Sequence, residues 1–146
     1  MMRVAQVMSR VGRLFRRTGV SVRRRGKIVI LNSMLLGSAD AERLKAWYRD
    51  GFRAEVDGYG NLDLGGFGLV IEQRDDVAAK NAEPGRHIVN FAVDDIEAAA
   101  AHLRTLDVDW LVHPEDRGIG WFATLIDPDG NYVQLIQMKP EYYAQK

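Results

Sequence analysis

The hydrophobic pattern of the chain becomes regular at about residue 28. Residues 28–36 are a run rich in β-branched and aliphatic side chains, which predicts a strand buried on both faces. Ser38 or Asp40 then offers a cap for an amphipathic helix whose apolar residues recur at helical spacing, namely Leu44, Trp47 and Tyr48. Three short strands separated by glycines follow, at residues 52–56, 61–64 and 67–73. The first half therefore reads βαβββ.

A polar stretch without periodicity, residues 75–86, predicts a linker, and the same pattern then starts again. Residues 88–93 predict a strand, and Asp94 or Asp95 caps a helix. The remaining elements are a strand at 108–112, a loop at 113–120 and strands at 121–126 and 132–137, the last two joined by a tight turn at 127–131. The second half is also βαβββ.

This duplication predicts an α+β fold in which two βαβββ modules form one domain with a concave sheet. Neither module can cover its own sheet, so each is expected to bury its apolar face against the other and to share a cavity with it. The predicted boundaries are module one at 27–74, the linker at 75–86, module two at 87–138 and a tail at 139–146.

The composition limits the kinds of fold and site that the chain can form. A chain of 146 residues with 47% hydrophobic residues can bury one sizeable core. It contains no cysteine, which excludes disulfides, thiolate metal sites and a cysteine nucleophile. No window approaches 18 consecutive apolar residues, so no membrane-spanning helix is predicted. These features favour a cytoplasmic location.

The net charge of zero hides an uneven distribution. Residues 1–27 hold nine Lys or Arg and no acid, whereas residues 28–146 carry 11 basic and 20 acidic side chains, a balance of 11 − 20 = −9. Nucleic-acid binding by the acidic domain is therefore not expected. The basic segment, residues 1–26, is amphipathic if helical. We interpret it as a disordered extension or a start-site artefact, with membrane-surface contact and a transit peptide as alternatives.

Three segments resemble the vicinal oxygen chelate superfamily, which includes glyoxalase I, fosfomycin-resistance, bleomycin-resistance and extradiol dioxygenase proteins. They are residues 38–52 (SADAERLKAWYRDGF), residues 91–96 (FAVDDI) and residues 127–131 (DPDGN) before a final strand. The resemblance covers about residues 28–138. It implies a glyoxalase-like fold, a ligand cavity between the modules and a homodimer.

In metal-dependent members of that superfamily, the first and last strands of each half supply His, Gln or Glu ligands. The resemblance maps these positions onto Ser33, Ile88, Glu72 and Gln134. Ser33 and Ile88 are poor ligands for a divalent ion, so no metal and no other cofactor is expected. Rescuing the site with His87 would need a one-residue register slip that turns Val89, Phe91 and Val93 into the cavity.

The predicted function is binding of a small organic molecule, for which Glu72 is a candidate general base or an anchor for a cationic group. The expected ligand-binding residues are Ser33, Glu72, Ile88, Asn90, His113, Trp121 and Gln134. His102, near the end of a helix, needs no chemistry to explain it. Two alternatives stay open. One is a metal-dependent lyase, isomerase or dioxygenase, and the other is a non-catalytic interaction module recruited to a membrane by its basic arm. Whether the protein is an enzyme is left undecided.

Overall fold

The structure is a computed structural model that describes residue 29 and residues 31–145. The predicted basic extension lies outside the described residues. The first module contains β1 (Ser33–Ser38), α2 (Ala41–Phe52), β2 (Glu55–Val56), β3 (Leu62–Asp63) and β4 (Gly68–Gln73). The second contains β5 (Val89–Ala92), α3 (Ile96–Arg104), β6 (Asp109–Asp116), β7 (Gly120–Ile126) and β8 (Tyr132–Met138), followed by the short α4 (Pro140–Tyr143). The predicted βαβββ order is confirmed in both halves.

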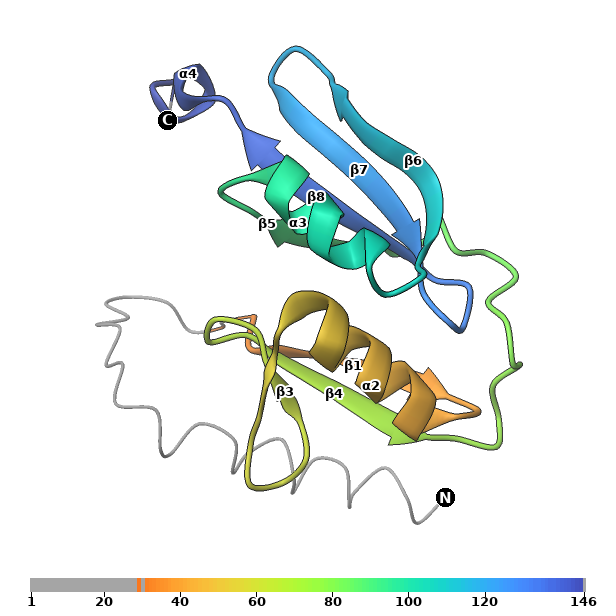
Figure 1. Cartoon of the computed structure of the whole chain (residues 1–146). Coiled ribbons are helices and arrows are strands. Elements are labelled where there is room, and N and C mark those ends of the chain that lie inside the picture. The colour runs from red at the N-terminus through yellow and green to blue at the C-terminus, as the bar shows by residue number, and fades with distance from the viewer. Residues whose placement is uncertain (1–28, 30, 146) are drawn as a thin grey trace.

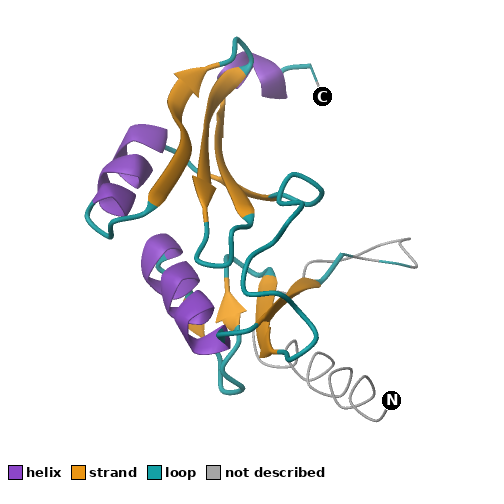
Figure 2. Cartoon of the chain, turned by 90° about the vertical axis from the view of Figure 1, so that its right-hand side faces the viewer, coloured by secondary structure: helices purple, strands orange, loops and turns teal. Residues whose placement is uncertain are grey.

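Each module has one four-stranded sheet, and the strand orders correspond. The first sheet runs β1-β4-β3-β2 and the second runs β5-β8-β7-β6. In both, the first and last strands of the module pair in parallel, and the other pairs are antiparallel. Figures 1 and 2 show α2 and α3 on one side of the molecule, with both sheets behind them. Each sheet therefore has a helix face and an open face, and both open faces lie on the side away from the helices.

The two helices begin in the same way. Asp40 accepts a hydrogen bond from the backbone N–H of Arg43, and Asp95 accepts one from Ala98. The first N–H of each helix donates to a glutamine near the end of the last strand of the module: Ala41 N–H to Gln73 Oε1 at 3.0 Å, and Ile96 N–H to Gln137 Oε1 at 2.8 Å. These caps satisfy helix N–H groups that have no partner within the helix.

The core lies between the sheets and the helices. Strand alternation turns Leu69 and Ile71 of β4 and Val133 and Leu135 of β8 toward it. Leu44 and Tyr48 of α2 are fully buried there, and Trp47 packs against them, as the helical spacing predicted.

The modules join through α2. The Phe52 ring stacks on Phe91 of β5, with centroids 3.9 Å apart and planes 9° apart. The Tyr48 hydroxyl, buried in the core, donates to Asp127 Oδ2 at 2.9 Å. Asp127 opens the β7–β8 turn and also accepts three hydrogen bonds from within that turn. The modules thus share a core on the helix side, but their open faces do not cover one another.

Several predicted boundaries were wrong. The first strand begins at Ser33, not at residue 28, and it is not buried on both faces, since Leu35 is 37% exposed. Phe52, predicted to begin a strand, is instead the last residue of α2, which is terminated by Arg53 in the left-handed conformation. His113 and its neighbours, predicted as loop, extend β6 to Asp116, because this segment keeps pairing with β7 across register shifts.

Candidate functional site

The repeated caps align the two halves residue by residue. The capping acids are 95 − 40 = 55 residues apart, and the capping glutamines are 137 − 73 = 64 residues apart. Leu35 on the first strand therefore corresponds to Asn90, and Val70 on the last strand corresponds to Gln134. The strand registers agree, because Leu35 pairs with Val70 and Asn90 pairs with Gln134.

The alignment changes which residue of the second half corresponds to Glu72. Its counterpart in the second half is Ile136, not Gln134, since each directly precedes a capping glutamine (73 − 1 = 72 and 137 − 1 = 136). The interpretation of Glu72 and Gln134 as equivalent positions was wrong by two residues. Sequence spacing did not detect this because the halves differ in loop length.

A row of uncharged polar side chains crosses the open face of the second sheet. Asn90, Gln134 and Thr124 are successive cross-strand partners on β5, β8 and β7. On β7, the Thr124 side chain points to the face away from its core neighbours Ala123 and Leu125, and it is only 5% exposed. None of the three side chains hydrogen-bonds to any residue that the structure describes, whereas Gln73 and Gln137 on the helix faces are both engaged. We call Asn90, Gln134 and Thr124 the amide row.

The corresponding position in the first sheet is apolar. Leu35 and Val70 pair there, and Val70 is 9% exposed. The duplicated frame therefore carries an amide pair in one half and an aliphatic pair in the other. A surface of this kind offers a few oriented polar groups beside apolar area, which is typical of small-molecule sites.

Glu72 lies on the open face of the first sheet, two residues beyond Val70. Its Oε2 atom is buried and has no hydrogen-bond partner among the described residues. Arg74 projects from the same face, and its Nη1 lies 3.6 Å from Glu72 Oε2. That separation makes an ion pair but exceeds a normal N–H···O bond of about 2.9 Å.

Asp76 binds the other edge of the Arg74 guanidinium. Arg74 Nε and Nη2 donate to the two carboxylate oxygens of Asp76 at 2.7 and 2.5 Å. This hydrogen-bonded pair lowers the pKa of Asp76 below its ordinary value. The Arg74 side chain crosses β1 at Gly37, where an added Cβ would meet Arg74 Cδ at 2.4 Å. Glycine at position 37 therefore leaves room for the arginine.

The donor set does not fit a divalent metal. Ser33 pairs with Gly68, four residues before Glu72 on β4, so Ser33 and Glu72 are separated by about 13 Å along the strands. Ile88 supplies no donor atom, and Glu72 already faces a guanidinium. Across residues 29 and 31–145, no three His, Asp or Glu side chains are grouped so that they could hold a metal ion.

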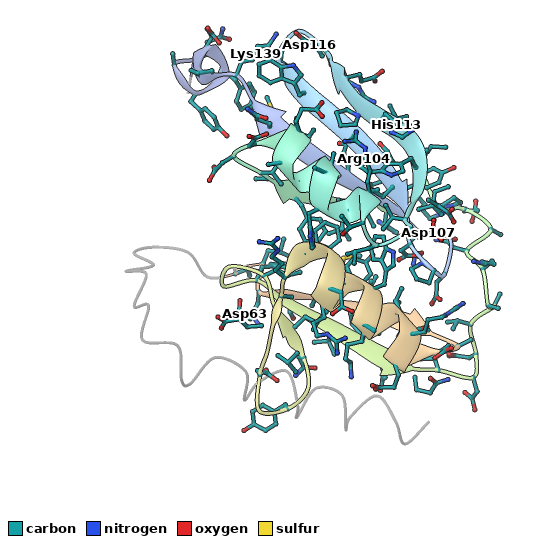
Figure 3. The ribbon with its side chains drawn as sticks, in the orientation of Figure 1. Asp63, Arg104, Asp107, His113, Asp116 and Lys139 are labelled. Atoms are coloured by element: carbon teal, nitrogen blue, oxygen red, sulfur yellow. The ribbon has the colours of Figure 1, made fainter. Side chains whose placement is uncertain are left out.

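Two of the predicted ligand-binding residues lie away from the open faces. Trp121 packs against the core on the same side of β7 as Ala123, and Lys139 lies over its ring. His113 stacks on Trp110, which also packs against the core. Figure 3 shows His113 near Arg104, whose guanidinium lies over Trp110. A role for either residue on the same surface as Asn90 and Gln134 would require it to leave this packing.

The other two histidines are also accounted for. His87 is exposed in the bend before β5 and borders a hollow of about 320 Å³ between the modules. His102 Nε2 donates to the Asp50 carbonyl at 2.9 Å, a contact from α3 to α2. That structural contact between the modules was not anticipated from the sequence, because nothing in the spacing shows which helix ends meet.

The match to a known family covers most of the chain. Residues 30–135 match the Glyoxalase/Bleomycin resistance protein/Dioxygenase superfamily. The protein belongs to this superfamily. The match spans both modules and the linker, so the duplicated frame is the family's frame, and the resemblance inferred from three short segments is confirmed.

Solved structures share the fold at low sequence identity. FosX, a fosfomycin resistance protein from Mesorhizobium loti, is 22% identical, with 81% of this chain and 99% of that chain covered and a TM-score of 0.64. TnmS3, an antibiotic binding protein from Streptomyces sp. CB03234, is 21% identical over 77% and 98% of the two chains, with a TM-score of 0.59. A glyoxylase/bleomycin resistance protein/dioxygenase domain from Frankia sp. EAN1pec is 15% identical over 77% and 100%, with a TM-score of 0.65. No curated protein sequence matches the chain significantly.

None of the helices among the described residues combines the length and the apolarity needed to cross a bilayer. The hypothesis of recruitment to a membrane surface depends on the basic segment, residues 1–26, which lies outside the described residues.

Proposed function

We propose that this superfamily member binds a small organic molecule on the open faces of its two sheets and does so without a divalent metal. The amide row carries the proposal. Three adjacent polar side chains, one of them 5% exposed, have no internal hydrogen-bond partner in the described part of the chain. Asn90 is exposed, whereas Gln134 and Thr124 are at least partly withdrawn from solvent. Polar groups in such positions normally acquire partners, and a ligand with carbonyl, amide or hydroxyl groups supplies them.

The neighbouring structures support the same class of function. FosX is named for fosfomycin resistance and TnmS3 for antibiotic binding. We infer from these names that sequestration of an antibiotic-like compound is the first activity to test. A mild reaction in which Glu72 acts as the base is the second, because its side chain is 33% exposed and accepts no hydrogen bond from the described residues.

A homodimer forms part of the proposal. Leu35, on the edge strand β1, and Ile88, just before the edge strand β5, are 37% and 40% exposed in the single chain. A second copy placed over the open faces would cover these side chains and close the site around a ligand. Sedimentation equilibrium tests this, and a monomer at concentrations of about 100 μM would contradict it.

The test of ligand binding is a titration of the ¹⁵N-labelled protein with fosfomycin, bleomycin and a library of small polar compounds, followed by NMR. A bound compound is expected to shift the amide resonances of β5, β7 and β8. Gln134→Leu should weaken its binding roughly tenfold, the value of about one hydrogen bond. Gln145→Leu is the matched control, since Gln145 is exposed on the C-terminal tail. Binding that ignores Gln134 and shifts only resonances on the helix faces would refute the proposed site.

A further inference from the structure

The ion pairs of Arg74 are unequal. Arg74 makes two short hydrogen bonds to Asp76 but stays 3.6 Å from Glu72 Oε2. A bidentate carboxylate–guanidinium pair fixes both distance and direction. The arginine is therefore committed to Asp76. The Glu72 carboxylate accepts no hydrogen bond from the described residues; its Oε2 atom is buried, while the side chain as a whole is 33% exposed and can be approached by a ligand.

The local charge is also unbalanced. Glu72 and Asp76 bring two negative charges and Arg74 brings one positive charge, so the group carries −2 + 1 = −1. The Glu72 and Arg74 side chains are 33% and 37% exposed, respectively, so they are partly withdrawn from water. A partly desolvated carboxylate without a full complement of donors is costly, and a cationic donor from a ligand relieves that cost.

The surroundings select for a cation that is also organic. Leu35 and Val70 form the aliphatic pair next to Glu72 on the same open face. The aliphatic part of the Arg74 side chain lies over Gly37, which is the cross-strand partner of Glu72 on β1. A hydrated metal ion gains nothing from such neighbours, whereas an alkyl or aryl ammonium buries its hydrocarbon part against them.

We propose that Asp76 holds the Arg74 guanidinium away from Glu72, so that Glu72 binds a protonated amine or amidine of the ligand. Asp76 is then a positioning residue that determines specificity without touching the ligand. This inference deepens the proposed function and rests on it, because it names the ligand group that binds beside the aliphatic pair.

The experiment compares three probes of the same size, benzylamine, benzyl alcohol and benzoate, by NMR titration at pH 7. The wild-type protein should bind benzylamine more tightly than benzyl alcohol and should bind benzoate least. Asp76→Asn removes the charge that holds Arg74, which can then bond directly to Glu72. The preference for amine over alcohol should fall roughly tenfold, with alcohol binding unchanged.

A second variant separates this role from a structural one. In the double variant R74Q/D76N no guanidinium can close on Glu72, so the preference for the amine should return. Glu72→Gln should abolish that preference in every background. If D76N leaves the ratio unchanged, if the double variant fails to restore it, or if none of the probes binds, the inference is wrong. Ligands found in the library screen would still bind the amide row, so failure of this inference differs from failure of the proposed function.

Discussion

Removing the Tyr48 hydroxyl tests how the two modules are held together. Tyr48 is fully buried, and its hydroxyl donates to Asp127 Oδ2 across the module junction at 2.9 Å. Burial raises the pKa of Tyr48 far above its ordinary value, and the neighbouring Asp127 adds to this, so the phenol stays protonated as a donor. In Tyr48→Phe the aromatic packing is kept and only this bond is lost.

The expected loss can be estimated from the partners of Asp127. Its Oδ1 accepts from the backbone of Asp129 and Asn131, while Oδ2 accepts from Tyr48 and from Asn131 Nδ2. Without Tyr48, Oδ2 keeps one donor in a site where Asp127 is 2% exposed. A hydrogen bond to a charged group contributes about 1.5–3 kcal/mol, so we expect the free energy of unfolding to fall by about 2 kcal/mol.

The assay is urea denaturation at pH 7, followed by tryptophan fluorescence and analysed by linear extrapolation. Tyr59→Phe is the matched control, since Tyr59 is 55% exposed and its hydroxyl bonds to no described residue. A loss below about 0.5 kcal/mol for Tyr48→Phe, or an equal loss in the control, would refute the view that this bond fastens the modules.

The pH dependence gives an independent check. Burial raises the pKa of Asp127, although its donors, Tyr48 among them, oppose the shift. A folded-state pKa above the unfolded value means that the contribution of Asp127 to stability is present at low pH and is lost as the pH rises through the folded pKa. The Tyr48 hydroxyl favours the charged carboxylate, so the deficit of Tyr48→Phe should be largest near pH 7. It should shrink as the pH approaches about 4, where an unfolded Asp also gains its proton.

Two further substitutions probe the packing that positions the open faces. Gly120→Ala should destabilise the protein by about 1–3 kcal/mol, because the new Cβ would lie 2.5 Å from the backbone oxygen of Gln137. Thermal unfolding measures this loss. Gly58→Ala is the control, since its new Cβ would meet no atom within 4 Å. Phe52→Ala should lower the free energy of unfolding by about 3 kcal/mol, because it removes the ring stacked on Phe91. If the modules then unfold separately, calorimetry should show a broadened or split transition. A sharp, unshifted transition would contradict this.

The order of helices and strands could be predicted from the sequence because the caps and turns that bound them act locally. The capping acids Asp40 and Asp95 and the Asp127–Asn131 turn act on neighbouring backbone groups, so the residues alone indicate their effect. Strand parity was equally readable in β5, where Phe91 packs against the core and Asn90 is exposed. These features depend on periods of two and on contacts a few residues apart.

The candidate site was harder to predict from the sequence because it depends on the register between strands that are distant in the chain. Glu72 was matched to Gln134 by counting, but pairing across β1–β4 and β5–β8 shows that its counterpart is Ile136. Thr124 was missed altogether, since a threonine in an apolar strand looks like a core residue until its cross-strand partner Gln134 is known. The ion pairs of Arg74 with Glu72 and Asp76 were not predicted, because nothing in the sequence places the arginine side chain over Gly37.

The mismatch between the pairs Leu35–Val70 and Asn90–Gln134 has a consequence for the shape of a ligand. Two identical halves would present a twofold-symmetric surface, on which an elongated molecule could lie in either of two opposite directions with equal energy. With hydrocarbon on one half and amides on the other, the two directions differ in energy. An elongated molecule with one polar end and one apolar end should therefore bind in a single direction, with its polar end on Asn90 and Gln134 and its apolar end on Leu35 and Val70.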